Sequence, residues 1–154
     1  MSLTVLEQIG VKIAARLANV AGAKVIRPLQ IGKLPTIEDK TILLVQGDAF
    51  KNVELSHEGN PMVQAWDQEF AIDLFIREAE SDTQPVDTRI NDLLGKVIAA
   101  ITQPTDWEHW DNLATLTNFE SMVPFALVNG VFSGTELTIT VTYRHRENDP
   151  YTAC

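Results

Sequence analysis

Apolar residues near the start of the chain recur every three or four positions, which is the period of one face of an α-helix. Thr4, followed by Glu7 three residues later, is a candidate capping box, and Gly22 stands where a C-terminal stop belongs. The pattern therefore predicts a first helix packed on a sheet. Its apolar stripe consists of Leu3, Leu6, Ile9, Ile13, Leu17 and Val20.

A second stripe with the same period lies between Pro85 and Pro104. Pro85 suits the first helical position, where a missing N–H costs nothing, and Pro104 ends the helix. Gly95 stands in the middle, and we expect a close approach of helix to sheet there. This second stripe consists of Val86, Ile90, Leu93, Leu94, Val97, Ile98 and Ile101.

Residues 66–76 alternate between apolar and polar side chains, and so do residues 135–146. A period of two predicts strands with one apolar face on the core, and it places Asp67, Glu69 and Asp73 on a solvent face. At ~3.3 Å per residue the first of these strands is about 36 Å long, beyond the usual length. Such a strand bridges a large sheet or projects beyond its own domain.

Shorter runs of β-branched and apolar residues predict the remaining strands. Gly47-Asp48 is expected to stop one of them, and Pro124 to split another. Residues 105–112 are expected to form a loop. The short predicted strands cover residues 24–27, 41–45, 51–57, 113–119 and 123–128.

The order of helix, strands, helix, strands predicts an α+β fold, in which an antiparallel or mixed sheet carries two main helices on one face. The chain of 154 residues has the length of one domain. We expect a folded core over 1–147 and an extended C-terminal tail over 148–154.

Composition and charge argue against several classes of protein. The net charge of -9 argues against a protein that grips a nucleic-acid backbone through broad surface charge, although a local basic patch could still contact phosphate. Cys154 is the only cysteine, so no intrachain disulfide and no cysteine-based metal site is expected. No stretch has the about 18 uninterrupted apolar residues of a membrane span. Lys12 and Arg16 interrupt the first stripe, unlike a signal peptide, which favours a protein made and assembled inside a cell.

Catalytic motifs are not found in the sequence. The glycines are isolated and form no phosphate-binding loop, and Ser121 and Ser133 lack the G-x-S-x-G setting. The histidines at 57, 109 and 145 lie far apart and form no metal-binding pair. We therefore expect no catalytic residue, no metal and no cofactor.

Two acidic groups leave an alternative open. Residues 106–111 combine carboxylates with an imidazole, but consecutive residues point in different directions, which favours Trp107 and Trp110 as anchors of a loop with the charges in solvent. The stripe of Asp67, Glu69 and Asp73 has a spacing of ~7 Å between alternate residues, which a hydrolase or a small-molecule site could use. A solvated sheet face is the more ordinary interpretation.

Charge is distributed unevenly along the chain. Residues 1–35 carry five basic side chains and one acidic one, a net of +4, whereas residues 64–92 carry eight acids and two arginines, a net of -6. This polarity can arise by chance on helix and sheet surfaces. It is also the pattern that a head-to-tail ring uses, with the basic patch of one subunit against the acidic patch of the next.

The run WDQEFAIDLFI at 66–76, followed by a helix and by LTITVTYR at 137–144, resembles tail terminator (tail completion) proteins of long-tailed bacteriophages. The opening amphipathic helix and the Asp149-Pro150 ending fit the same pattern. The resemblance covers most of the chain in its order of elements and rests on alternating apolar residues. It implies a structural, non-enzymatic protein of the virion tail, assembled in the cytoplasm of a bacterial host.

The resemblance also implies the partners. Copies of the chain would form a homo-oligomeric ring, a hexamer, that caps the tail tube, contacts the major tail tube protein and a head-completion or connector protein, and passes DNA only as cargo. We expect no membrane partner. The excess of acid suits a channel that must not hold DNA. Two alternatives stay open: another head–tail connector or minor tail protein, and a small-molecule binding module or hydrolase.

The expected ring interface combines an acidic strand face with a basic surface. An outward, exposed Phe75 is expected beside Asp67, Glu69 and Asp73. The basic partners are either Lys12 and Arg16 on the outer face of the first helix, or Arg144 and Arg146 at the end of the last strand.

Overall fold

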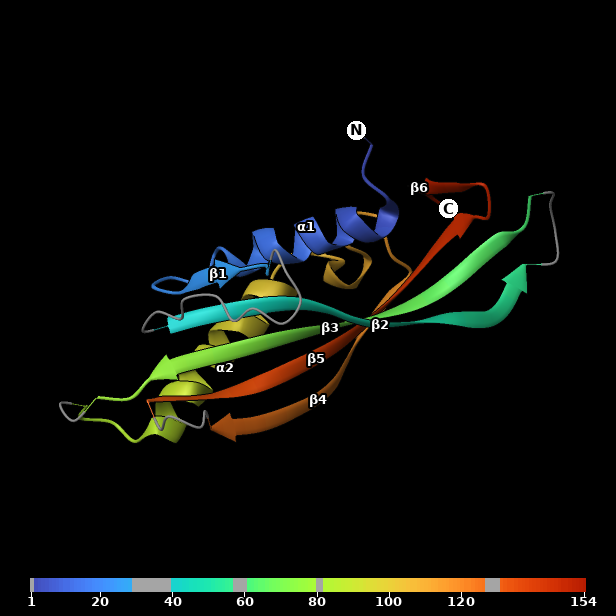
Figure 1. Ribbon diagram of the computed structural model, residues 1–154. Helices are drawn as coiled ribbons and strands as arrows, with labels where there is room; N and C mark the ends of the chain where they lie inside the picture. Colours follow the sequence, from blue (N-terminus) through green and yellow to red (C-terminus); the bar gives the residue numbers. More distant parts are fainter. Residues whose placement is uncertain (1, 29–39, 57–60, 80–81, 127–130) are drawn as a thin grey trace.

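The computed structural model describes residues 2–28, 40–56, 61–79, 82–126 and 131–154. Two long helices and a twisted sheet form the described part, and one end of the sheet extends past the helices (Figure 1). In chain order the elements are α1 (Val5–Leu17), β1 (Lys24–Ile26), β2 (Lys40–Ser56), β3 (Val63–Arg77), α2 (Val86–Thr102), the 3-10 turn η1 (Trp107–His109), β4 (Leu116–Ala126), β5 (Phe132–Arg146) and β6 (Asp149–Ala153).

The sheet has the strand order β1-β2-β3-β5-β4, and β6 pairs with the end of β5. β1 runs parallel to β2, whereas the other neighbours are antiparallel. Both helices cover the same face of this sheet (Figure 1). The prediction of an α+β fold with a mixed sheet and helices on one face is confirmed. The sheet face turned away from the helices is called the outer face below.

The first helix begins as its sequence predicts. The Thr4 hydroxyl accepts a hydrogen bond from the backbone N–H of Glu7 at 3.2 Å, which satisfies one of the free donors of the first turn. The Glu7 carboxylate does not complete a capping box, because it binds the Arg27 guanidinium at 3.0 Å. Gly22 follows the helix with φ of 77°, a conformation that favours glycine.

The second helix differs from expectation in two details. Pro85 lies immediately before the first helical residue rather than within the first turn. Gly95 is exposed, and a Cβ built on it would meet nothing within 4 Å, so the expected close helix–sheet contact at Gly95 is wrong. The apolar stripe is confirmed, since Leu93, Val97 and Ile101 are buried.

The two long strands are confirmed and are longer than predicted. β3 and β5 have 15 residues each and pair without a break from Val63 opposite Arg146 to Arg77 opposite Phe132. This ladder is the centre of the sheet. The face of each strand that meets the helices is largely apolar. Together β3 and β5 supply most of the core residues that come from the sheet.

The predicted break at Gly47-Asp48 is wrong, because β2 continues through these residues as a β-bulge. The bulge frees backbone carbonyls that a regular ladder would satisfy. The buried Gln68 amide of β3 donates to the carbonyls of Gly47 at 2.7 Å and Asp48 at 3.2 Å. One side chain therefore holds the two halves of β2 in a single strand.

The predicted split at Pro124 is also wrong, because β4 is one strand. β4 is the last strand of the sheet, and an edge strand tolerates a residue without an N–H. The chain after residue 147 turns back as β6, and the Gln8 amide on α1 donates to the Tyr151 carbonyl at 3.1 Å. His57 and residues 127–128 of the predicted strands lie outside the described residues, and so does Lys33, one of the five basic residues of 1–35.

One hydrophobic core lies between the helices and the sheet. Its fully buried members come from α1, α2, the three central strands and the segment after α2, with Trp110 the largest. They include Val5, Ile9, Ile13, Leu17, Ile42, Phe70, Ile72, Ile76, Val97, Ile101, Trp110, Ile139 and Val141.

We expect Gly134→Ala to destabilise the fold by about 2 kcal/mol, the usual cost of overpacking. Gly134 lies opposite Phe75, and a Cβ there would collide with the Leu74 carbonyl and stand 2.8 Å from the Phe125 ring. Urea unfolding followed by circular dichroism measures this change. The matched control is Gly95→Ala, which should stabilise the exposed helix by up to about 1 kcal/mol. Equal effects at both positions would contradict the described packing.

Candidate functional site

The four β3 residues expected at an interface share the outer face of the sheet, but they differ in their surroundings. The Asp67 carboxylate accepts a hydrogen bond from the Thr142 hydroxyl of β5 at 2.6 Å. Glu69 lies opposite Thr140 and is half-buried. Asp67 and Glu69 therefore form an acidic, partly solvated surface beside the threonines of β5.

Asp73 lies directly opposite Glu136 on β5 and is part of a close carboxyl pair. Burial raises the pKa of Asp73 to about 7, and the hydrogen bond and charge of Glu136 add to the effect. The Oδ1 atom of Asp73 is buried, with no hydrogen-bond partner in the described part of the chain. The pair therefore prefers to hold a proton near neutral pH.

Phe75 points to the outer face as expected, but the prediction that it is exposed is wrong. Only 4% of Phe75 is accessible, because the Phe125 ring of β4 packs against it edge-on with 5.1 Å between the ring centroids. Gly134 between them allows this contact, since it has no side chain on that face. Phe75 therefore serves the interior of the subunit, a role that sequence spacing could not show.

Lys12 and Arg16 both bind within the subunit. The Lys12 ammonium lies 2.8 Å from the Asp111 carboxylate. The Arg16 guanidinium stacks on the Trp110 ring, 4.0 Å from its centroid, and donates to the carbonyls of Ile101 at 3.1 Å and Trp107 at 2.8 Å. Burial lowers the pKa of Arg16, and the charge of Asp111 acts in the opposite direction. These contacts fasten the segment after α2 to α1.

Arg144 and Arg146 are exposed at the end of β5, where this strand pairs with the start of β3. By the alternation of β5 both belong to the outer face, like Asp67 and Glu69. The structure therefore brings the second pair of predicted basic residues, and not Lys12 and Arg16, onto the same face as the acidic stripe.

The prediction that Trp107 and Trp110 anchor the 106–111 segment is confirmed. Trp110 is fully buried, and its indole N–H donates to the Thr117 hydroxyl at 2.7 Å. Asp106 and Asp111 are exposed to solvent. Trp110 has φ of 47°, an uncommon value for a bulky residue, which the buried indole contacts hold in place. Among the residues described, no group of three His, Cys, Asp or Glu side chains could hold a metal ion.

Sequence reasoning missed an apolar groove of about 330 Å³ between α2 and the edge strand β4. Four apolar side chains of β4 are exposed: Leu116, Phe119, Met122 and Val123. The sequence signal was present, because apolar residues occupy both faces of the 116–126 segment around Pro124. The groove is lined by Ile98, Phe119, Glu120, Ser121, Met122 and Leu137.

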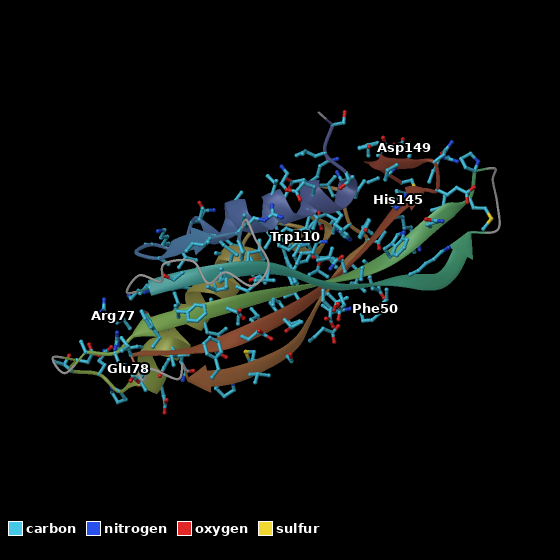
Figure 2. The ribbon with its side chains drawn as sticks, viewed as in Figure 1. Phe50, Arg77, Glu78, Trp110, His145 and Asp149 are labelled. Atoms are coloured by element: carbon cyan, nitrogen blue, oxygen red, sulfur yellow. The ribbon has the colours of Figure 1, made fainter. Side chains whose placement is uncertain are left out.

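Phe50 is a further exposed apolar residue of the sheet, on β2 rather than β4. It lies on the part of β2 that extends past the helices (Figure 2), and 53% of it is accessible. Lys51 beside it is also exposed. The sheet thus carries exposed apolar side chains on both of its long sides.

The likeness of this chain to known proteins lies in its fold. No protein-family model and no curated protein matches this sequence. The fold aligns with a chain of the virion of a native gene transfer agent particle, with 9% sequence identity and a TM-score of 0.37. The alignment covers 94% of this chain and 96% of that chain.

None of the helices in the described part of the chain has the length and apolar character that a membrane span needs.

We expect Asp73→Asn to raise the free energy of unfolding at pH 8, because it removes a carboxyl whose ionised form the folded state disfavours. The expected gain is on the order of 1 kcal/mol, since solvent reaches the pair and screens it. The folded state raises the pKa of Asp73 from 3.8 to about 7, so it favours the protonated form. The stabilisation from this group is complete below about pH 4 and is lost as the pH rises through 7. Urea unfolding at pH 5 and pH 8 measures the difference.

The substitution should therefore have a smaller effect at pH 5 than at pH 8. Glu136→Gln serves as the partner variant. It removes the second carboxyl and should therefore also reduce the pH dependence of the free energy of unfolding. If Asp73→Asn keeps the wild-type pH dependence of stability, the carboxyl pair does not titrate as described.

Proposed function

We propose that this chain is a non-enzymatic, ring-forming structural protein of a phage-like virion, and specifically a tail terminator. In this role identical copies close into a ring, a hexamer, at the end of the finished tail tube. The ring contacts the major tail tube protein on one side and a head-completion or connector protein on the other.

The observation that carries the proposal is the open sheet with exposed apolar side chains on both long sides. Phe50 on β2 and four residues of β4 are exposed, although the subunit has a complete core of its own. Apolar residues gathered on the edges of a sheet indicate contacts with other protein surfaces. Two such sides on one subunit allow head-to-tail contacts, which close into rings.

The charge of the chain supports the same role. The net charge is -9, and Asp67 and Glu69 lie on the outer face of β3. An acidic surface repels the phosphate backbone, as a channel that passes DNA without binding it requires. DNA would be cargo here, and no membrane contact is needed.

Among the residues proposed for contacts between subunits, Asp67 and Glu69 with Arg144 and Arg146 form the stronger set. Both arginines are exposed and lie on the outer face with the acids. Lys12 and Arg16 are weaker candidates, since their charged groups bind Asp111, Trp110 and two carbonyls within the subunit.

The other candidates are less well supported. A connector or minor tail protein with the same architecture would use the same surfaces, so particle assembly must separate it from a terminator. A hydrolase would need carboxylates of β3 that are free to reach a substrate, but Asp67 accepts a hydrogen bond from Thr142 and Asp73 is paired with Glu136.

The proposal is tested by electron microscopy of native particles from cells with and without this gene. We expect antibody against the protein to label a ring where the tail joins the head. Without the gene, tails should exceed their normal length and lack heads, because nothing stops tube growth. Reintroduced wild-type protein is the control. Tails of normal length that lack heads would favour a connector, and particles that lack the protein would exclude a virion role.

A further inference from the structure

Two buried polar atoms lie on the face of β3 that meets the helices, the helix face, and have no hydrogen-bond partner in the described part of the chain. They are the indole Nε1 of Trp66 and the amide Oε1 of Gln68. Trp66 and Gln68 are alternate residues of β3, so both side chains leave the same face of the sheet. Because a buried polar atom without a hydrogen bond is costly, these two atoms indicate a ligand between them.

We propose that one buried water molecule binds between Trp66 and Gln68. Its oxygen accepts a hydrogen bond from the Trp66 indole N–H, and it donates one hydrogen to the Gln68 amide oxygen. This water completes the polar cluster that holds the bulge of β2. The inference concerns the interior of the subunit and does not depend on the proposed function.

The orientation of the Gln68 amide is fixed by its other hydrogen bonds. Its Nε2 atom donates to the carbonyls of Gly47 at 2.7 Å, Glu69 at 2.9 Å and Asp48 at 3.2 Å. Exchanging Nε2 and Oε1 would set an acceptor against three acceptors and lose all three bonds. Oε1 therefore points away from these carbonyls and retains its capacity to accept a hydrogen bond from another donor.

The chemistry of the two atoms selects water over an ion. The indole N–H only donates and the amide oxygen only accepts, so a ligand between them must accept and donate at once. A chloride ion has no hydrogen for Oε1, and an ammonium or metal cation has no lone pair for the indole N–H. Water has both, and folded proteins hold about one buried water per 27 residues, each with two to four polar partners.

The site lies at the boundary between the core and a solvent-exposed strand. Gln68 is fully buried, and Trp66 packs against the hydrophobic core. On β2, Ala49 lies opposite Gln68 and Lys51 lies opposite Trp66, and both of these β2 residues are exposed. Solvent is therefore one strand away from the site, and the bound water can exchange without unfolding of the helices.

The bound water would connect the bulge of β2 to the core. Hydrogen bonds run from the carbonyls of Gly47 and Asp48 to the Gln68 amide, and from there through the water to the Trp66 indole. Phe50 follows this bulge and lies on the part of β2 that extends past the helices (Figure 2). The water therefore helps to fix the direction of that part of the sheet.

A crystal structure of the wild-type chain, at a resolution that shows ordered water, tests the site directly. We expect one water oxygen at about 2.9 Å from Trp66 Nε1 and about 2.8 Å from Gln68 Oε1. A direct hydrogen bond between these two atoms would overturn the proposal. A water bound to only one of them, or to neither, would also overturn it.

Nuclear magnetic resonance tests the same site in solution. The Trp66 indole proton should show cross-relaxation with water whose sign is opposite in the laboratory and rotating frames, as for a water bound longer than the protein takes to tumble. Exchange of the indole proton with solvent would give the same sign in both frames. Trp66→Phe assigns the resonance, and the absence of the bound-water signal at the Trp66 indole would refute the proposal.

A pair of matched variants identifies the acceptor. Gln68→Met removes the amide oxygen at similar length and should abolish the bound-water signal at Trp66, because a thioether is a weak acceptor. Gln64→Met makes the same change on the same face of β3, on the other side of Trp66, and should leave the signal unchanged. The indole resonance of Trp110, which Thr117 holds, reports whether each variant is folded.

The results for the two variants decide the assignment. A signal that survives in folded Gln68→Met, or that is lost in folded Gln64→Met, would show that Gln68 does not bind the water and would overturn the proposal. If Gln68→Met does not fold, the crystal structure of the wild-type chain decides alone.

Discussion

The unbroken ladder between β3 and β5 is the constraint on which the rest of the structure depends. It pairs 15 residues of each strand, so the helix face and the outer face stay in register from one end of the sheet to the other. On the helix face this register aligns Phe70 and Ile72 with Ile139 and Leu137 under the two helices. On the outer face the same register sets Asp73 against Glu136, a costly contact that the fold retains.

A second set of contacts decides which surfaces are left for partners. Arg16 stacks on Trp110 and binds two carbonyls, and the Trp110 indole binds Thr117 at the start of β4. These contacts fix the segment that connects the end of α2 to β4 at the edge of the sheet. β4 is thereby held as the edge strand, and its side chains Leu116, Phe119, Met122 and Val123 stay exposed.

Much of the architecture could be predicted from local patterns. Apolar residues spaced three and four positions apart predicted both helices, and apolar residues at every second position predicted the long strands. Both spacings follow from backbone geometry alone. The errors at Gly47 and Pro124 have one cause. Residues that interrupt an isolated strand are tolerated when a neighbour compensates, as Gln68 does for the bulge, or when the strand lies at an edge.

The sequence by itself determined the class of fold, the acidic charge and the alternation that places Asp67, Glu69 and Asp73 on one face, since each depends only on residues close along the chain. Tertiary structure alone decided that Phe75 is buried by Phe125, that Arg16 is used within the subunit, and that β1 and β4 are the edge strands of the described sheet. The physical reason is the strand order: which strands become neighbours depends on packing between distant segments, and only that packing separates an internal contact from a free surface.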